Sequence, residues 1–243
     1  PYGQLCDQIH AYGAKVVTQL TVGLGRVAYA DRIDTAPYGP SANPLRGNPA
    51  VSTRVFTAEQ IHDVVTSYGK AALMLKKAGA DGIEMHAYGG YLFDQFLTSA
   101  WNRREDEYGG SLENRSRFPL MILKAIREAV GDDFFLDMRI SGDEMVEGGM
   151  KIDEVIEFIK MAQEYIDMVN ISAGLIVDWR AQFFTMPPYY QPHCLNVSLS
   201  RAVKECPDVT IPVTVVGCIA NIDEAEEIIG SGAADACYMA RAL

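Results

Sequence analysis

The chain has 243 residues and a formal net charge of -11 at pH 7, from 21 basic and 32 acidic side chains. Hydrophobic residues make up 49% and charged residues 22%, which is ordinary globular usage and excludes a disordered or collagen-like chain. The acidic balance argues against a nucleic-acid partner, because no excess of Lys and Arg is present to displace counterions from phosphates. No apolar run approaches the roughly 20 residues that cross a bilayer, and the first residues show no signal-peptide pattern, so we expect no membrane partner.

The cysteine pattern favours a reducing compartment. Five cysteines are scattered along the chain without a Cys-x-x-Cys pair. In a chain of this length such a set is typical of free thiols and a cytoplasmic location, and we expect no metal site built from these residues.

Short apolar or β-branched runs alternate with amphipathic helical stretches, which is typical of a parallel α/β fold. Thr57 and Gln60 form a capping-box pattern, and the helix that follows is expected to stop at Gly79. The expected strands cover residues 15–20, 82–86, 134–140, 168–172, 212–216 and 236–239. The other expected helices cover residues 4–12, 118–129, 152–159 and 221–230.

Six strand-helix units fall short of the eight in a (β/α)8 TIM barrel, which needs around 250 residues. The sequence also opens on a helix and stops after a strand. We therefore predict one domain over residues 1–243, a barrel fragment of about six βα units that lacks the first two. Two connections, 21–56 and 174–196, are unusually long and follow carboxyl ends of strands, where α/β folds place their sites.

A dinucleotide-binding fingerprint is matched only superficially. Residues 23–28 fit the pattern G-x-G-x-x-A after a strand. That site needs a helix directly afterwards, whereas Pro37, Pro40 and Pro44 exclude one long helix here. We therefore do not interpret this segment as a Rossmann site.

The stretch 79–118 is the most informative part of the chain. A predicted strand ends at His86, the paired glycines Gly89 and Gly90 permit a close turn, and Tyr91 follows. A His and a Tyr at the mouth of a barrel could donate hydrogen bonds to a substrate oxygen or deliver a proton. The residues alone leave open, and favour, a half-buried pair with a structural role.

The same stretch resembles the signature of the old yellow enzyme family of flavin-dependent oxidoreductases. The matching elements are D-G-x-E-x-H, G-Y-L-x-x-Q-F-L and N-x-R-x-D-x-Y-G-G-S-x-E-N-R-x-R-F. Weaker matches at 19–20, 139–141, 216–219 and 239–243 extend the likeness over nearly the whole chain. It is similar above all to the branch with 2,4-dienoyl-CoA reductases and enoate reductases.

The resemblance implies FMN across the carboxyl-end face of the barrel. Gln19 and Arg139 match residues that bind the flavin ring, where a cation stabilises the negative charge of the reduced form. Gly217, Ala240 and Arg241 match the phosphate site after the last barrel strands.

The resemblance also implies catalytic roles. Tyr91 matches the tyrosine that protonates the substrate α-carbon, and His86 matches the first of two residues that bind the activating carbonyl. The second of that pair is Gly89 here, which has no side chain. Tyr88 or a residue outside this sequence is a candidate replacement, and the departure puts the substrate in doubt.

Two further segments have open or structural interpretations. The aromatic segment 174–196 could form a substrate wall or a packed lid without a role in selectivity. The charged segment 102–117 is interpreted as an ion-paired loop and helix start.

The predicted function is NAD(P)H-dependent reduction of a C=C bond in a small unsaturated carbonyl or acyl-CoA substrate. Alternatives are a steroid or bile-acid ring oxidoreductase, an amine dehydrogenase, or a noncatalytic flavin-binding barrel. A flavin-free lyase or aldolase is disfavoured because Lys15, Lys76 and Lys77 lie at strand starts or in helices. The resemblance implies that a longer parent carries a [4Fe-4S] cluster and FAD, and a homo-oligomer is compatible with it.

Overall fold

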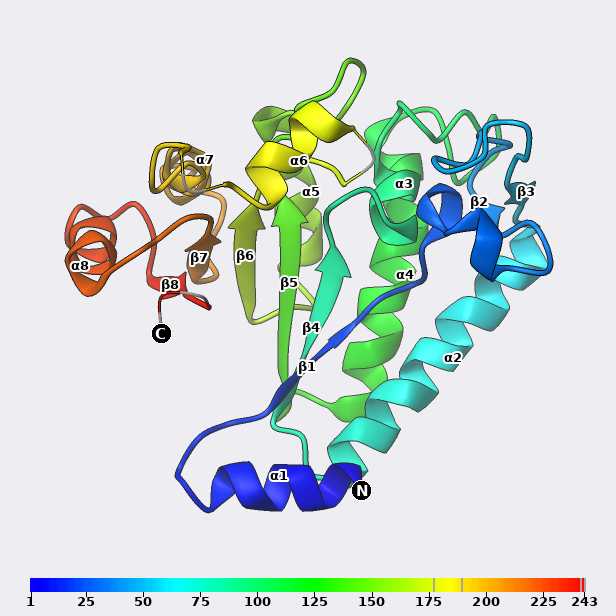
Figure 1. Cartoon of the computed structure of the whole chain (residues 1–243). Helices are drawn as coiled ribbons and strands as arrows, with labels where there is room; N and C mark the ends of the chain where they lie inside the picture. The colour runs from blue at the N-terminus through cyan, green and yellow to red at the C-terminus, as the bar shows by residue number, and fades with distance from the viewer. Residues whose placement is uncertain (177, 189, 241, 243) are drawn as a thin grey trace.

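The computed structural model describes residues 1–176, 178–188, 190–240 and 242. Its main feature is a parallel sheet of six strands in the order β1-β4-β5-β6-β7-β8, in which each strand pairs with the next (Figure 1). This order is that of a (β/α)8 barrel wall. The strands are β1 (Val17–Leu20), β4 (Gly82–Ala87), β5 (Phe135–Ser141), β6 (Met168–Ser172), β7 (Val213–Val216) and β8 (Ala236–Tyr238), with a separate pair β2 (Tyr38–Gly39) and β3 (Arg54–Val55).

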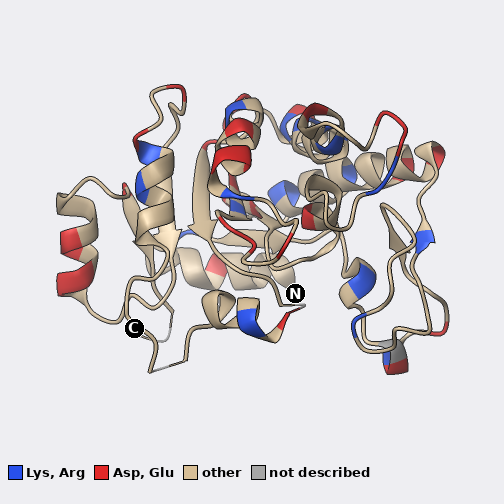
Figure 2. Cartoon of the chain, turned by 90° about the horizontal axis from the view of Figure 1, so that it is seen from above, with Lys and Arg blue, Asp and Glu red and all other residues tan. Residues whose placement is uncertain are grey.

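Helices cover the outer face of the sheet, and shorter ones lie at the carboxyl ends of the strands. Figure 1 shows α2 and α4 side by side, with α3, α6 and the β2-β3 pair above the strand ends. Seen from above, acidic residues, drawn red on the ribbon, lie on many of the surrounding helices and loops (Figure 2). The helices are α1 (Tyr2–His10), α2 (Ala58–Lys77), α3 (Leu92–Leu97), α4 (Leu112–Val130), α5 (Ile152–Ala162), α6 (Trp179–Thr185), α7 (Val197–Lys204) and α8 (Ile222–Gly230), with 3-10 turns at Gly25–Val27 and Ala30–Arg32.

The six predicted strands are confirmed to within two residues at each end, and the capping box is present, since Thr57 and Gln60 exchange hydrogen bonds. The segment after β1 holds only short turns and strands, as its prolines indicate. Among the described residues, no helix has the length and apolarity needed to cross a bilayer.

Three sequence-based assignments were wrong or incomplete. The first helix spans Tyr2–His10 rather than residues 4–12. The segment 174–196 is not all loop, because Asp178 caps α6 by accepting hydrogen bonds from the backbone N–H groups of Arg180 and Ala181. The helices α3 and α7 were not predicted, because six to eight residues give too few turns for a clear helical period.

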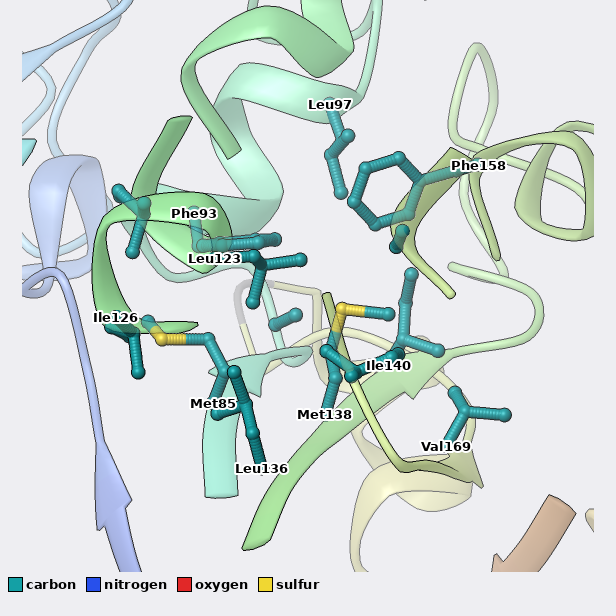
Figure 3. Close-up of a cluster of buried hydrophobic side chains, with 14 of the residues drawn as sticks. Met85, Phe93, Leu97, Leu123, Ile126, Leu136, Met138, Ile140, Phe158 and Val169 are labelled. Carbon is teal, nitrogen blue, oxygen red and sulfur yellow. The ribbon is translucent and has the colours of Figure 1, made fainter. Parts of the chain in front are cut away.

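The hydrophobic core lies between the outer face of the sheet and its helices. Alternate residues of β4 and β5 point outward, and Figure 3 shows Met85 and Met138 packed toward Leu123 of α4 and Phe93 of α3. All four side chains are fully buried. The opposite set of strand residues therefore faces the inside of the curved sheet.

A buried carboxyl pair holds α3 in place. Asp94 accepts a hydrogen bond from the backbone N–H of Gly90 at 2.7 Å, and Glu144 accepts from Thr98 Oγ1 at 2.7 Å and from the Met150 N–H at 2.6 Å. Burial raises the pKa of both carboxyls, and each lies close enough to affect the other. The pair thus links α3 to the loop after β5.

We expect the Leu123→Ala variant to lose about 2–5 kcal/mol of unfolding free energy, because it empties a fully buried position. Urea denaturation measures this loss. Leu73→Ala on α2, where the side chain is 36% exposed, is the control and should lose clearly less. Equal losses would contradict this description of the core.

The Asp94→Asn variant tests the carboxyl pair. A carboxyl with a raised pKa in the folded state stabilises the fold fully below its unfolded pKa of about 4, and this contribution is lost as the pH rises through the raised value. The contribution of Asp94 should therefore fall as the pH rises from about 4 to above 7, and the difference in unfolding free energy between the wild type and the non-ionising variant should change over that range. Asp7→Asn on the exposed face of α1 is the control, and an unaltered pH dependence in Asp94→Asn would refute the pair.

Candidate functional site

Polar side chains fill the inner face of the sheet. Gln19 Nε2 donates to Glu84 Oε1 at 2.5 Å, and Asn170 Nδ2 donates to Glu84 Oε2 at 3.3 Å. Across the same face, the Tyr238 hydroxyl donates to Asp137 Oδ2 at 2.6 Å. These bonds join β4 to β1 and β6, and β5 to β8, so the inner face is one polar layer.

Burial dominates the electrostatics of this layer. It raises the pKa of Asp137, and the neighbouring Glu84 carboxyl raises it further, while the Tyr238 hydrogen bond opposes the shift. Glu84 and Asp137 are directly paired in the register of β4 and β5. The adjacent Glu84 carboxyl therefore favours the protonated form of Asp137.

Aromatic and cationic groups lie two residues further along β4 and β5, toward the carboxyl ends of these strands. His86 and Arg139 are register partners on β4 and β5. The Arg139 guanidinium lies 3.9 Å from the centre of the Tyr88 ring and donates to Ser172 Oγ at 3.3 Å. The His86 ring is centred 4.3 Å from Tyr88 and 4.5 Å from Tyr91. The structure therefore brings Arg139, His86 and Tyr91 together, as the sequence predicted.

The titrating groups of this cluster are neutral near pH 7. Burial, aided by the Arg139 charge, lowers the pKa of His86 to about 4. Burial, with smaller effects from neighbouring tyrosines, raises the pKa of Tyr91. Tyr91 consequently retains a phenolic proton, and His86 is an uncharged ring that can donate through one nitrogen.

The turn that carries Tyr91 is fixed by glycine geometry and one glutamine. Gly89 and Gly90 have φ of 76° and 84°, a region that side chains disfavour. Gln95 Nε2 donates to the carbonyls of Gly90 at 2.7 Å and Leu24 at 3.0 Å, while Gln95 Oε1 accepts from the Arg26 N–H at 3.2 Å. Gln95 thus fastens the segment after β1 to the turn before Tyr91.

The predicted phosphate site is only partly described. At Gly217, with φ of 140°, a Cβ would lie 2.4 Å from Asn196 Nδ2, so glycine is required there. Asn196 Nδ2 in turn donates to the Val216 carbonyl at 2.6 Å. Ala240 is exposed, and Arg241 lies outside the described residues.

A cavity of about 760 Å³ opens between residues 27–31, residues 46–48 and Gln182 of α6. None of the predicted site residues lines it. Hydrogen bonds connect it to the Tyr91 turn: the Arg46 N–H donates to the Arg26 carbonyl, the Arg26 N–H donates to Gln95 Oε1, and Gln95 Nε2 donates to the Gly90 carbonyl. This cavity is therefore separate from Gln19 and Arg139, the residues that the resemblance assigns to the flavin ring.

Sequence reasoning missed the polar layer beneath the cluster, formed by Glu84, Asp137, Asn170 and Tyr238. A signal was present, because Glu84 precedes His86 by two residues and Asp137 precedes Arg139 by two. Residues two apart on a strand share a face. The charged segment 102–117 is structural as predicted, since Arg115 pairs with Glu154 at 2.7 Å and Ser111 caps α4.

The segment 174–196 brings α6 above the strand ends, with Trp179 63% exposed and its ring 5.9 Å from that of Phe183. Gly89 forms a bridge to Leu175, so this segment is attached to the Tyr91 turn. Both interpretations, a substrate wall and a packed lid, remain predictions.

Comparisons with known proteins identify the family. Residues 1–243 match the model of the NADH:flavin oxidoreductase / NADH oxidase family. The cinnamate reductase of Clostridium sporogenes is 35% identical, with 99% of this chain and 38% of that protein covered. A 2-naphthoyl-CoA reductase in complex with 2-naphthoyl-CoA superposes with a TM-score of 0.87 at 30% identity, covering 99% of this chain and 38% of the other. Histamine dehydrogenase from Rhizobium sp. 4-9 also gives a TM-score of 0.87, at 31% identity and coverages of 99% and 34%.

These matches confirm the predicted barrel fold. The chain spans a little more than a third of the length of the cinnamate reductase. Because the family model covers every residue of the sequence, the chain belongs to the NADH:flavin oxidoreductase / NADH oxidase family, to which old yellow enzyme-type proteins belong.

Proposed function

We propose that the protein carrying this chain is an FMN-dependent oxidoreductase that reduces a C=C bond conjugated to a carbonyl or thioester, with NAD(P)H as the electron source. The observation that carries the proposal is the cluster of neutral His86, protonated Tyr91 and cationic Arg139 at the carboxyl ends of β4 and β5. The names of the similar cinnamate and 2-naphthoyl-CoA reductases support it.

The residues at the strand ends fit a flavin ring. Arg139 Nε, His86 Nδ1 and Asn170 Oδ1 are buried and lack hydrogen-bond partners among the described residues. Buried polar groups of this kind normally have partners, and a ring with several oxygens and nitrogens would provide them. We propose that Gln19 and Arg139 bind the ring of FMN, and that Gly217, Ala240 and Arg241 bind its phosphate. When bound, FMN supplies hydride transfer between NAD(P)H and the substrate.

Tyr91 and His86 have separate roles in the proposed reaction, proton delivery and carbonyl binding. Tyr91 keeps its proton at neutral pH and can deliver it to the substrate α-carbon. His86, held neutral by burial, can donate a hydrogen bond to the substrate carbonyl oxygen, where negative charge develops. The Arg139 guanidinium adds a fixed positive charge beside them.

In the family pattern two residues bind the activating carbonyl oxygen of the substrate. Here only the first, His86, has a side chain that can donate, because Gly89 stands at the second position. Tyr88 lies between His86 and Arg139, in ring contact with the first and under the guanidinium of the second. We propose Tyr88 as the second contact for the substrate oxygen.

A second candidate function is amine oxidation. It is favoured by the structural match to histamine dehydrogenase, which has the same TM-score as the match to the naphthoyl-CoA reductase. We further propose that the full-length protein carries additional redox groups, a [4Fe-4S] cluster and FAD, outside residues 1–243. The absorbance spectrum of the full-length protein tests this extension.

The Tyr91→Phe variant tests the proposed function. We expect bound FMN to be reduced by NAD(P)H at the wild-type rate, because the phenol takes no part in that step. Anaerobic reoxidation by an enone should slow about 10²- to 10⁴-fold, since the proton donor is lost. Stopped-flow absorbance measures both half-reactions.

Tyr12→Phe, where the ring is 90% exposed at the end of α1, is the control and should leave both rates unchanged. Unchanged reoxidation in Tyr91→Phe would remove this residue from the role of acid. Bound FMN that no enone reoxidises would contradict the proposed reaction, and reduction by histamine-like amines would establish the second candidate.

A further inference from the structure

Arg46 lines the cavity of about 760 Å³ described above, and it belongs to a group of three arginines that lack acidic partners. Arg26, Arg46 and Arg103 form no ion pair within 4 Å with any Asp or Glu of the described chain, although acidic residues outnumber basic ones. Their charges lie close together, because Arg46 and Arg103 both lower the pKa of Arg26, after the larger effect of its burial. Unbalanced positive charges in an acidic protein favour a bound anion.

Backbone and ring contacts hold this cluster in place. The Arg46 N–H donates to the Arg26 carbonyl at 2.9 Å, and the Arg26 guanidinium lies 3.8 Å from the centre of the Trp101 ring. Arg26 Nε and Trp101 Nε1 are buried donors without an acceptor among the described residues. Donors in excess of acceptors are the complement of a phosphate, which offers only acceptors and negative charge.

The cavity places this charge beside the reacting cluster. Arg46 lines the cavity of about 760 Å³ with Tyr29 and Gln182, and its backbone is bonded to Arg26, which Gln95 joins to the Gly90 carbonyl directly before Tyr91. Asp31 is the acidic residue of the same lining. The volume suits a ligand much larger than a single carboxylate, since small-molecule sites commonly measure about 300–1,000 Å³.

We propose that Arg46, supported by Arg26 and Arg103, forms a phosphate subsite in this cavity. It would hold the diphosphate tail of a ligand whose other end reaches Tyr91. The identification of that end as the reacting one depends on the proposed function. Two classes of ligand contain such a diphosphate. One is an unsaturated acyl thioester of a nucleotide carrier, and the other is the nicotinamide dinucleotide that supplies electrons.

The test is equilibrium binding, measured by calorimetry on the full-length protein with inorganic pyrophosphate, coenzyme A, pantetheine and ADP-ribose. Arg46 is the residue to change, because its exposed side chain forms no hydrogen bond within the described structure, whereas Arg26 and Arg103 contact ring or backbone groups. We expect Arg46→Gln to weaken pyrophosphate binding about tenfold and Arg46→Glu to weaken it further, because a charge-assisted hydrogen bond is lost and then replaced by repulsion. Arg46→Lys should retain part of the affinity.

Lys70→Gln on the exposed face of α2 removes the same charge elsewhere and should leave pyrophosphate binding unchanged. Loss of affinity in Arg46→Gln for coenzyme A but not pantetheine assigns the subsite to an acyl carrier, and loss for ADP-ribose assigns it to the dinucleotide. Equal pyrophosphate affinity in wild type and Arg46→Gln overturns the proposal. Binding is measured without turnover, so a failure of the enone-reduction hypothesis would be seen separately.

Discussion

The hydrogen-bonded layer inside the sheet sets the position of everything above it. Glu84 and Asp137 are adjacent buried carboxyls. Glu84 is bonded to Gln19 of the neighbouring β1 and to Asn170 of β6, and Asp137 is bonded to Tyr238 of β8, three strands away. A buried carboxyl without partners is costly, so this layer is stable only in the observed strand register. Register then dictates the next layer, because residues two positions further along β4 and β5 must face the same side.

The position of Tyr91 also depends on the turn before it and on the short helix that follows. The turn at Gly89 and Gly90 uses backbone angles that other residues disfavour, and the turn is bonded to Asp94 and Gln95 from the helix that follows. The tyrosine therefore sits between a strand fixed by the polar layer and a short helix fixed by buried carboxyls. This rigidity suits a proton donor, since an acid must be held within hydrogen-bond reach of the atom that it protonates.

Local periodicity was sufficient to predict the strands. The meeting of His86, Tyr91 and Arg139 was implied by the family resemblance, because the residues alone favoured a structural role for the His and Tyr. The sequence was insufficient where contacts join distant segments. Arg26 and Arg46 are 20 residues apart and meet only through the irregular path of the chain after β1. Helix α6 was missed because seven residues give almost no period, although Asp178 was a usable capping signal.

The charge distribution bears on the choice between the two candidate reactions. The chain has 32 acidic and 21 basic residues, so its net charge of -11 attracts a free cation overall. The balance differs at the cavity, because its lining holds Arg46 and Asp31, and Arg26, the residue before the lining Val27, adds a positive charge without an acidic partner in the described chain. If ligands enter through this cavity, as the proposed phosphate subsite implies, its excess positive charge disfavours a protonated amine and favours an anionic acyl carrier or dinucleotide. The positive charge near the cavity thus differs in sign from the net charge of the chain. It supports the proposed reduction of an unsaturated acyl substrate over the second candidate, oxidation of an amine.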